Sequence, residues 1–221
     1  MRRQLAGALG FFVFAGVALA APPAGAKVEF SIFKLRARSL SADFGGFSDD
    51  DCIITQTHIL FSEFVDFQTG VPPISQPPTT QVTLDYSNNC TGEFVELTGG
   101  TTQQSFQVTG DLGKASLIAT VPVSDDSGTY NANVSLDVTW TANAPLGRDK
   151  STTVTHTADS VTVSKTNVQA RTADVIGPVS TVLMTPAGPT FIDLARIPQG
   201  GQLGKDNQGS RTITFLGGHK H

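Results

Sequence analysis

The chain has 221 residues, with 15 Lys and Arg against 19 Asp and Glu, and its formal net charge is −4 at pH 7. Charged residues make up 15% of the sequence, against roughly 25% in an average soluble domain. Thr, Ser, Val and Phe, which favour strands and turns, are abundant. This composition argues against helical bundles, coiled coils and Rossmann-type enzymes. A mildly acidic chain without basic blocks also argues against nucleic-acid binding.

The first 26 residues have the pattern of a secretory signal peptide. Two arginines precede an apolar stretch, Leu5 to Ala20, that is shorter than the about 20 apolar residues of a membrane span. Cleavage after Ala26 is favoured over cleavage after Ala20, because Pro22 and Pro23 would end the apolar helix. The alternative is an uncleaved membrane anchor. Loss of residues 1–26 removes two positive charges and changes the net charge from −4 to −6, and we expect no stable membrane insertion afterwards.

Both cysteines, Cys52 and Cys90, follow the predicted signal peptide. An exported chain with two cysteines has one obvious pairing, and closing a loop of this length stabilises a fold by about 4 kcal/mol. A metal site would need more Cys or His at ligand spacing, and a catalytic thiol would need a partnering His. The sequence therefore predicts a Cys52–Cys90 disulfide.

Alternating apolar and polar residues predict strands along most of the chain. The clearest case is Tyr130 to Thr141, which follows a similar segment, Lys114 to Val123, after a Ser-Asp-Asp-Ser-Gly turn. These two segments predict an antiparallel hairpin with one buried face. Further strands are expected at residues 28–37, 53–67, 82–86, 94–97, 106–108, 152–157, 161–168, 179–184 and 212–216.

Breaks in the alternation predict the connecting segments. A switch of parity indicates a bulge near Ile32 and Phe33. Proline-rich residues 69–80 are expected to form an extended connector, and residues 142–150 a loop. Residues 186–205 form the longest irregular region, with a short helix at residues 191–197. We therefore predict an all-β fold, a single antiparallel β-sandwich of about ten strands, immunoglobulin-like or jelly-roll-like, over residues 27–216 with a flexible tail at 217–221.

Catalytic constellations are hard to find. The histidines are His58, His156, His219 and His221, and no G-x-S-x-G elbow is present. The first two are expected to be hydrogen-bonded strand residues, and the last two lie in the tail. The four Glu residues carry no signal of a paired-carboxylate site. The sequence therefore predicts no catalytic residue and leans against an enzyme.

We predict no cofactor and no metal site, and calcium is the one candidate kept beside that prediction, because extracellular sandwiches bind it through loop carboxylates. The two acidic clusters are residues 49–51 and residues 125–126, and neither has the alternating spacing that aims ligands at one point. Sugar-binding modules instead stack exposed aromatic rings on their ligands. Trp140, Tyr130 and Tyr86 all lie in phase with apolar strand residues, so we expect them in the core.

One stretch of the chain carries a resemblance. It contains Cys90-Thr91-Gly92, Phe106-Gln107-Val108, Leu112 to Leu117, Ala119 to Val123 and Trp140-Thr141. From about residue 86 to residue 148 the chain resembles a family of small secreted bacterial proteins. The resemblance implies a bacterial, exported origin, and it carries over no activity and no functional residue.

The expected function follows from these observations. We predict a secreted protein, periplasmic or extracellular, that acts as a non-enzymatic binding or structural module. Its partner would be a protein or glycan at the cell surface, with no nucleic acid involved. A carbohydrate- or calcium-binding accessory module, and a hydrolase whose catalytic residues are scattered in the sequence, are the alternatives.

Overall fold

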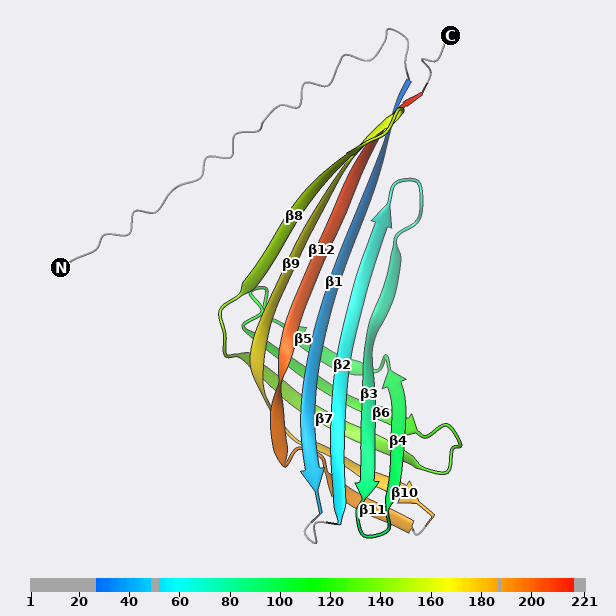
Figure 1. The fold of residues 1–221 in the computed structure, drawn as a ribbon, viewed down its shortest axis with the longest axis vertical. Helices are drawn as coiled ribbons and strands as arrows, with labels where there is room; N and C mark the ends of the chain where they lie inside the picture. The colour runs from blue at the N-terminus through cyan, green and yellow to red at the C-terminus, as the bar shows by residue number, and fades with distance from the viewer. Residues whose placement is uncertain (1–26, 49–51, 187, 217–221) are drawn as a thin grey trace, which may run out of the picture.

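The computed structural model describes residues 27–48, 52–186 and 188–216, and all regular secondary structure within these ranges is β-strand. The twelve strands pair antiparallel and hydrogen bonds join them in one sheet (Figure 1). The first six strands are β1 (Lys27–Phe47), β2 (Ile53–Gln68), β3 (Ile74–Asn88), β4 (Glu93–Thr101), β5 (Gln104–Val108) and β6 (Lys114–Ser124). The other six are β7 (Asn131–Ala142), β8 (Gly147–His156), β9 (Ser160–Ile176), β10 (Val179–Thr185), β11 (Gly188–Asp193) and β12 (Ile197–Leu216).

The sheet folds over on itself. Seven strands, named the long strands after the majority of them, run side by side in the order β4-β3-β2-β1-β12-β9-β8, and the crossing strands β5, β6, β7, β10 and β11 pass behind their lower half (Figure 1). Two short pairings connect these parts. Thr98 of β4 pairs with Ser124 of β6, and residues 173–176 of β9 pair with residues 139–142 of β7.

The hydrophobic core lies between the long strands and the crossing strands. Alternating residues of each strand supply it, as the period of a strand requires. Trp140 is fully buried, and its indole N–H donates to the Ser41 carbonyl of β1 at 2.8 Å. The rings of Phe61 and Phe106 stack at 3.9 Å between centroids. These contacts hold the two parts of the sheet together.

The long strands continue well beyond the core. We use the name blade for this extension, which comprises residues 30–38 of β1, 63–67 of β2, 148–156 of β8, 161–169 of β9 and 205–213 of β12. Its inner face continues the core-facing side of the same strands, and its outer face is the opposite side. In Figure 1 the blade rises above the crossing strands, and β1 begins and β12 ends at its tip.

The predicted all-β antiparallel class and the 114–141 hairpin are confirmed. Cys52 and Cys90 form a disulfide, with their Cα atoms 5.3 Å apart. A sandwich of the immunoglobulin or jelly-roll type stays a prediction, because all twelve strands belong to one hydrogen-bonded sheet. Within the described ranges, no helix has the length and apolar character to cross a bilayer.

The predicted bulge near Ile32 and Phe33 is wrong. The register of β1 with β12 is continuous there, and it shifts only between Asp43 and Phe44. Apolar residues change parity near Ile32 because both faces of the blade are open to solvent, so neither face is reserved for a core.

The predicted helix at residues 191–197 is also wrong. β11 ends at Asp193, residues 194–196 form a turn and β12 begins at Ile197; within β11, Ile192 is buried while Phe191 is 70% exposed. Burial that alternates residue by residue fits a strand rather than a helix. Residues 186–205 are therefore largely regular, and β8 already begins at Gly147 inside a segment predicted to be a loop.

The proline-rich segment is partly strand. β3 begins at Ile74 and contains Pro77 and Pro78. The register between β2 and β3 shifts at this point, from Ser62 opposite Thr79 to Phe64 opposite Gln76. The two prolines therefore take no place in the pairing ladder, which would require the N–H groups that they lack.

Candidate functional site

The histidines do not form a catalytic constellation within the described residues. His58 lies 2.7 Å from Asp43, from Nδ1 to Oδ1, on the outward side of β1 and β2. Both side chains are about half exposed. Thr83 lies in register with His58 on β3, but no hydrogen bond between their side chains is found in the described part. His156 lies at the blade tip, and His219 and His221 lie outside the described residues.

The four Glu residues lie on three different strands, β1, β2 and β4. Glu63 pairs with Arg38 on the inner face of the blade, and Glu93 accepts a hydrogen bond from the Tyr130 hydroxyl. Glu29 lies near the blade tip and Glu96 on β4. Where the chain is described, no three His, Cys, Asp or Glu side chains come close enough to hold a metal ion.

The structure describes only one of the two acidic clusters that were considered as calcium sites. Residues 49–51 lie outside the described ranges. In the other cluster, Asp125 closes the β6–β7 turn by accepting hydrogen bonds from the backbone N–H of Tyr130 at 2.8 Å and of Ser127 at 3.3 Å. Its carboxylate therefore serves the turn. Trp140 and Tyr86 are buried and Tyr130 packs against the core, as the sequence predicts.

The inner face of the blade brings together basic residues from four strands. The strand registers place side chains in rows across the blade, because residues in register on neighbouring strands share a face. From β8 to β2 the first row is Arg148, Gln169, Lys205, Arg38 and Glu63. The second row is Lys150, Asn167, Asn207, Arg36 and Val65. The third row is Thr152, Lys165, Gly209, Lys34 and Phe67.

We name the basic residues of these three rows the cationic band. They are Lys34, Arg36, Arg38, Arg148, Lys150, Lys165 and Lys205. From the spacings in a sheet, the band extends about 13 Å along the strands and about 14 Å across them. Arg171 at its lower border and Arg211 above it bring the total on this face to nine of the chain's 15 Lys and Arg. The only carboxylate within the three rows is that of Glu63.

The outer face of the same strands has the opposite charge. Asp66, Asp149 and Asp206 of the blade lie on it, and no Lys or Arg among the residues that define the blade does. Charges of opposite sign are therefore separated across the thickness of one sheet. The acidic net charge of the chain conceals a strongly basic surface.

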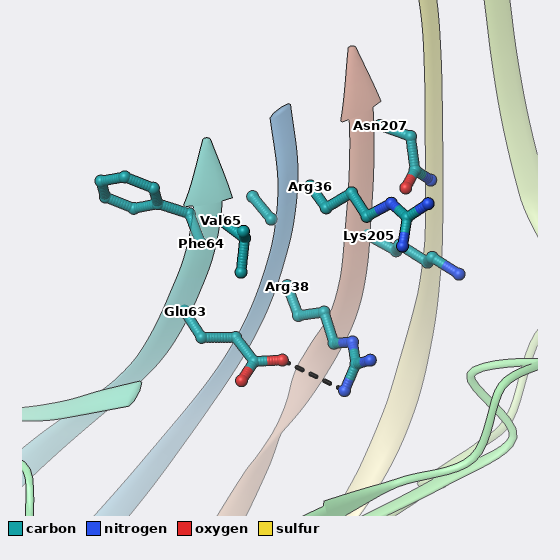
Figure 2. Close-up of a pocket in the computed structure, with 8 residues that line it drawn as sticks. Arg36, Arg38, Glu63, Phe64, Val65, Lys205 and Asn207 are labelled. Carbon is teal, nitrogen blue, oxygen red and sulfur yellow. Dashed lines mark ion pairs between the residues drawn. The ribbon is translucent and has the colours of Figure 1, made fainter. Parts of the chain in front are cut away.

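The centre of the band is hollow. Arg36, Arg38, Glu63, Lys205 and Asn207 line a cavity of about 590 Å³ that is open to solvent. Figure 2 shows these side chains pointing into it from β1, β2 and β12. The guanidinium of Arg38 lies 3.1 Å from the Glu63 carboxylate, and this is the one ion pair found for the band within the described ranges. The other cations remain available to an incoming group.

Two groups near the core mark the lower border of the band. Arg171 is half-buried, and its Nε has no hydrogen-bond partner in the described part of the chain. The β5–β6 turn carries Asp111. A hydrogen bond with the Thr109 side chain, a second one from the Gly113 backbone and the charge of Arg171 lower the pKa of the Asp111 carboxyl. The turn therefore presents an ionised carboxylate toward the base of the blade.

Such a surface can bind a ligand with several negative charges. Arg and Lys on four strands can donate charge-assisted hydrogen bonds to phosphate, sulfate or carboxylate oxygens. Asn167 and Asn207 add neutral donors in the second row. Since the band is broad, the ligand would be extended or would carry more than one anionic group.

Sequence reasoning missed this surface, although one signal was present. Lys34, Arg36 and Arg38 alternate with apolar residues, which places three cations on one face of a strand. Arg148 and Lys150 also lie two residues apart, with Asp149 between them. The other members became visible only when the registers aligned strands that are far apart in the sequence.

Comparison of the sequence with known proteins does not indicate what this surface binds. The sequence matches no protein-family model, and no curated protein matches it. The likeness of residues 86–148 to secreted bacterial proteins therefore stays an expectation.

Proposed function

We propose that the protein is a non-enzymatic binding module of the cell exterior, and that the cationic band holds a ligand with clustered anionic groups. The observation that carries the proposal is the collection of seven Lys and Arg side chains, from four strands, on one concave face of an acidic protein. The ligand's anionic groups would lie in the hollow lined by Arg36, Lys205 and Asn207.

The arrangement is costly for a purely structural role. Like charges opposite one another on neighbouring strands repel and destabilise a sheet. Arg148, Lys205 and Arg38 share one row with a single carboxylate. A charged residue that only kept the surface soluble would serve equally well with either sign. Binding of an anion turns the accumulated repulsion into attraction.

Location outside the cytoplasm is part of the proposal. The Cys52–Cys90 disulfide and the signal-peptide pattern of residues 1–26 both fit an oxidising compartment, periplasmic or extracellular. A partner at the cell surface, glycan, lipid or protein, would supply phosphate, sulfate or carboxylate groups.

The test measures binding of inorganic tripolyphosphate by isothermal titration calorimetry. The first variant carries Lys34→Gln, Arg36→Gln and Lys205→Gln, which removes three cations and keeps the Arg38–Glu63 pair intact. The matched control carries Gln68→Glu, Gln81→Glu and Gln202→Glu, three isosteric changes at exposed positions of the outward side. Both variants change the net charge by −3.

We expect the first variant to lose at least tenfold in affinity, about 1.4 kcal/mol or more, because charge-assisted hydrogen bonds are lost. The control should stay within twofold to threefold of the wild type. Affinity should also fall as salt is raised, since exposed charges are screened. Equal losses in both variants would mean that net charge alone governs binding, and the proposal would then be wrong.

A further inference from the structure

The inner face changes character above the cationic band. The fourth row consists of Val154, Val163, Arg211 and Ile32, and the fifth of His156, Val161, Ile213 and Phe30. We name Phe30, Ile32, Val154, Val161, Val163 and Ile213 the apolar rows. They directly continue the band toward the blade tip.

These apolar side chains meet solvent. Phe30 is 51% exposed and Val154 is 44% exposed. At the other edge of the band, Val65 and Phe67 of β2 are also exposed on this face. The crossing strands lie behind the lower half of the sheet only (Figure 1), and in the part of the chain that the structure describes nothing packs on the apolar rows.

One cation lies within the apolar rows. The guanidinium of Arg211 lies 5.0 Å from the centroid of the Phe30 ring, which is the geometry of a cation–π contact. The charge of Arg211 therefore lies among apolar side chains, between the cationic band and the blade tip. A ligand lying along this face would meet anion-binding groups first and apolar surface next.

We propose that the ligand is an anionic lipid, with its phosphate groups on the cationic band and an acyl chain along the apolar rows. This inference rests on the proposed function, since the band must bind anions for it to hold. Apolar surface beside an anion site gains free energy only from a ligand with an apolar part. A soluble polyanion would leave the apolar rows in water.

Charge argues against a second copy of the chain that would pair through the same inner face. Two inner faces placed together would oppose two cationic bands without counter-charges. The apolar rows alone extend about 7 Å along the strands and span four strands. That area suits an acyl chain, while a stable protein interface buries about 800 Å² on each partner.

The experiment compares three soluble probes by titration calorimetry on the full chain. Dodecyl phosphate, used below its micelle concentration, has both the anionic group and the chain. Inorganic phosphate has only the anionic group, and dodecyl maltoside has only the chain. We expect dodecyl phosphate to bind at least tenfold more tightly than either of the other two.

One variant tests the apolar rows themselves. Val161→Thr, Val163→Thr and Ile213→Thr make this surface polar with residues that strands accept. The matched control carries Val168→Thr, Val182→Thr and Ile118→Thr, the same chemical changes at exposed apolar positions away from the inner face. Fluorescence of Trp140, the single tryptophan, reports whether each variant folds.

We expect the inner-face variant to lose at least fivefold in affinity for dodecyl phosphate while its affinity for tripolyphosphate is unchanged. The control should match the wild type with both probes. Residues 1–26 are the same in every variant, so differences between variants cannot come from that apolar segment.

The outcomes separate the two proposals. If tripolyphosphate binds but the acyl chain adds nothing, the lipid inference fails and the anion-binding function stands. Tight binding of duplex DNA in place of the lipid probe would likewise overturn the inference. If neither tripolyphosphate nor dodecyl phosphate binds, the proposed function itself is wrong.

Discussion

Leu203 and Lys205 lie on the same face of β12, two residues apart, yet they belong to different regions. Leu203 is completely buried in the core, while Lys205 lines the hollow of the blade. The crossing strands lie behind the lower half of the long strands only (Figure 1), and Leu203 belongs to the core that they help to form. The comparison teaches that one uninterrupted strand can serve two purposes, and that the layer opposite it decides which side chains are tolerated.

Removal of the disulfide is expected to have the largest effect, and it tests whether the core and the blade differ in stability. Cys52→Ser with Cys90→Ser should lower the free energy of unfolding by about 4 kcal/mol, because the unfolded chain regains the entropy of an open loop. Urea unfolding followed by Trp140 fluorescence measures the loss. The disulfide lies at the end of β2 and β3 that is far from the blade tip.

Hydrogen exchange sharpens the same test. Core amides of β6 and β7, which open through global unfolding, should exchange about a thousandfold faster without the disulfide. Blade-tip amides should exchange through local opening and keep their rates. Equal acceleration in both regions would show that blade and core unfold as one unit.

A pair of substitutions on β12 tests the comparison within one strand. Leu203→Ala should cost about 2–5 kcal/mol, because it removes buried methyl groups and leaves a cavity. Lys205→Ala should change the free energy of unfolding by less than about 0.5 kcal/mol, as expected for a surface position. Similar costs at both positions, measured by urea unfolding, would remove the distinction between the regions.

Gly99 tests how closely the two parts of the sheet approach one another. A Cβ atom at this position would lie 1.9 Å from the Pro122 carbonyl oxygen, beside the pairing of Thr98 with Ser124. Gly99→Ala should therefore destabilise the fold by about 1–3 kcal/mol through overpacking. Gly110→Ala is the control, because a Cβ there would have no atom within 4 Å.

The smallest expected effect is a change in the pKa of Asp111, at the lower border of the blade. The pKa of the Asp111 carboxyl should lie below its ordinary value of 3.8. Thr109→Val should raise this pKa more than Arg171→Gln does, since the hydrogen bond with Thr109 is the main cause of the lowering. Because folding lowers this pKa, the stabilising contribution is present above pH 3.8 and is lost as the pH falls through the lowered value. Carboxyl NMR signals followed over pH measure it, and an unchanged pKa in Thr109→Val would contradict the assignment.

Strict alternation made the covered part of the fold predictable. Lys114 to Val123 and Tyr130 to Thr141 each have one apolar face because one face meets the core. The disulfide followed from the presence of two cysteines alone. Segments with two solvent-exposed faces were harder to predict. In residues 28–37 the two faces do not differ clearly in hydrophobicity, and the prediction depends on that difference.

Other elements depend on neighbours that the sequence does not reveal locally. Residues 191–197 suit a short helix by composition, but pairing of Phe191 with Val182 of β10 and burial of Ile192 hold residues 191–193 as strand, and a turn follows. The candidate site depends on registers to an even greater degree. Lys150, Arg36 and Asn207 share a row only because β8, β9, β12 and β1 align.

The order in which β1 and β12 occur has a kinetic consequence. They are the first and the last strand of the described residues, and they pair along nearly their whole length at the centre of the long strands, from Lys27 with Leu216 to Gly45 with Ile197. Contacts so distant in sequence form slowly. The sheet therefore cannot be completed until the last residues are available, and a chain still being synthesised would remain open. Late closure of the sheet would suit a chain that is exported before it folds, as the signal-peptide pattern of residues 1–26 predicts for this one.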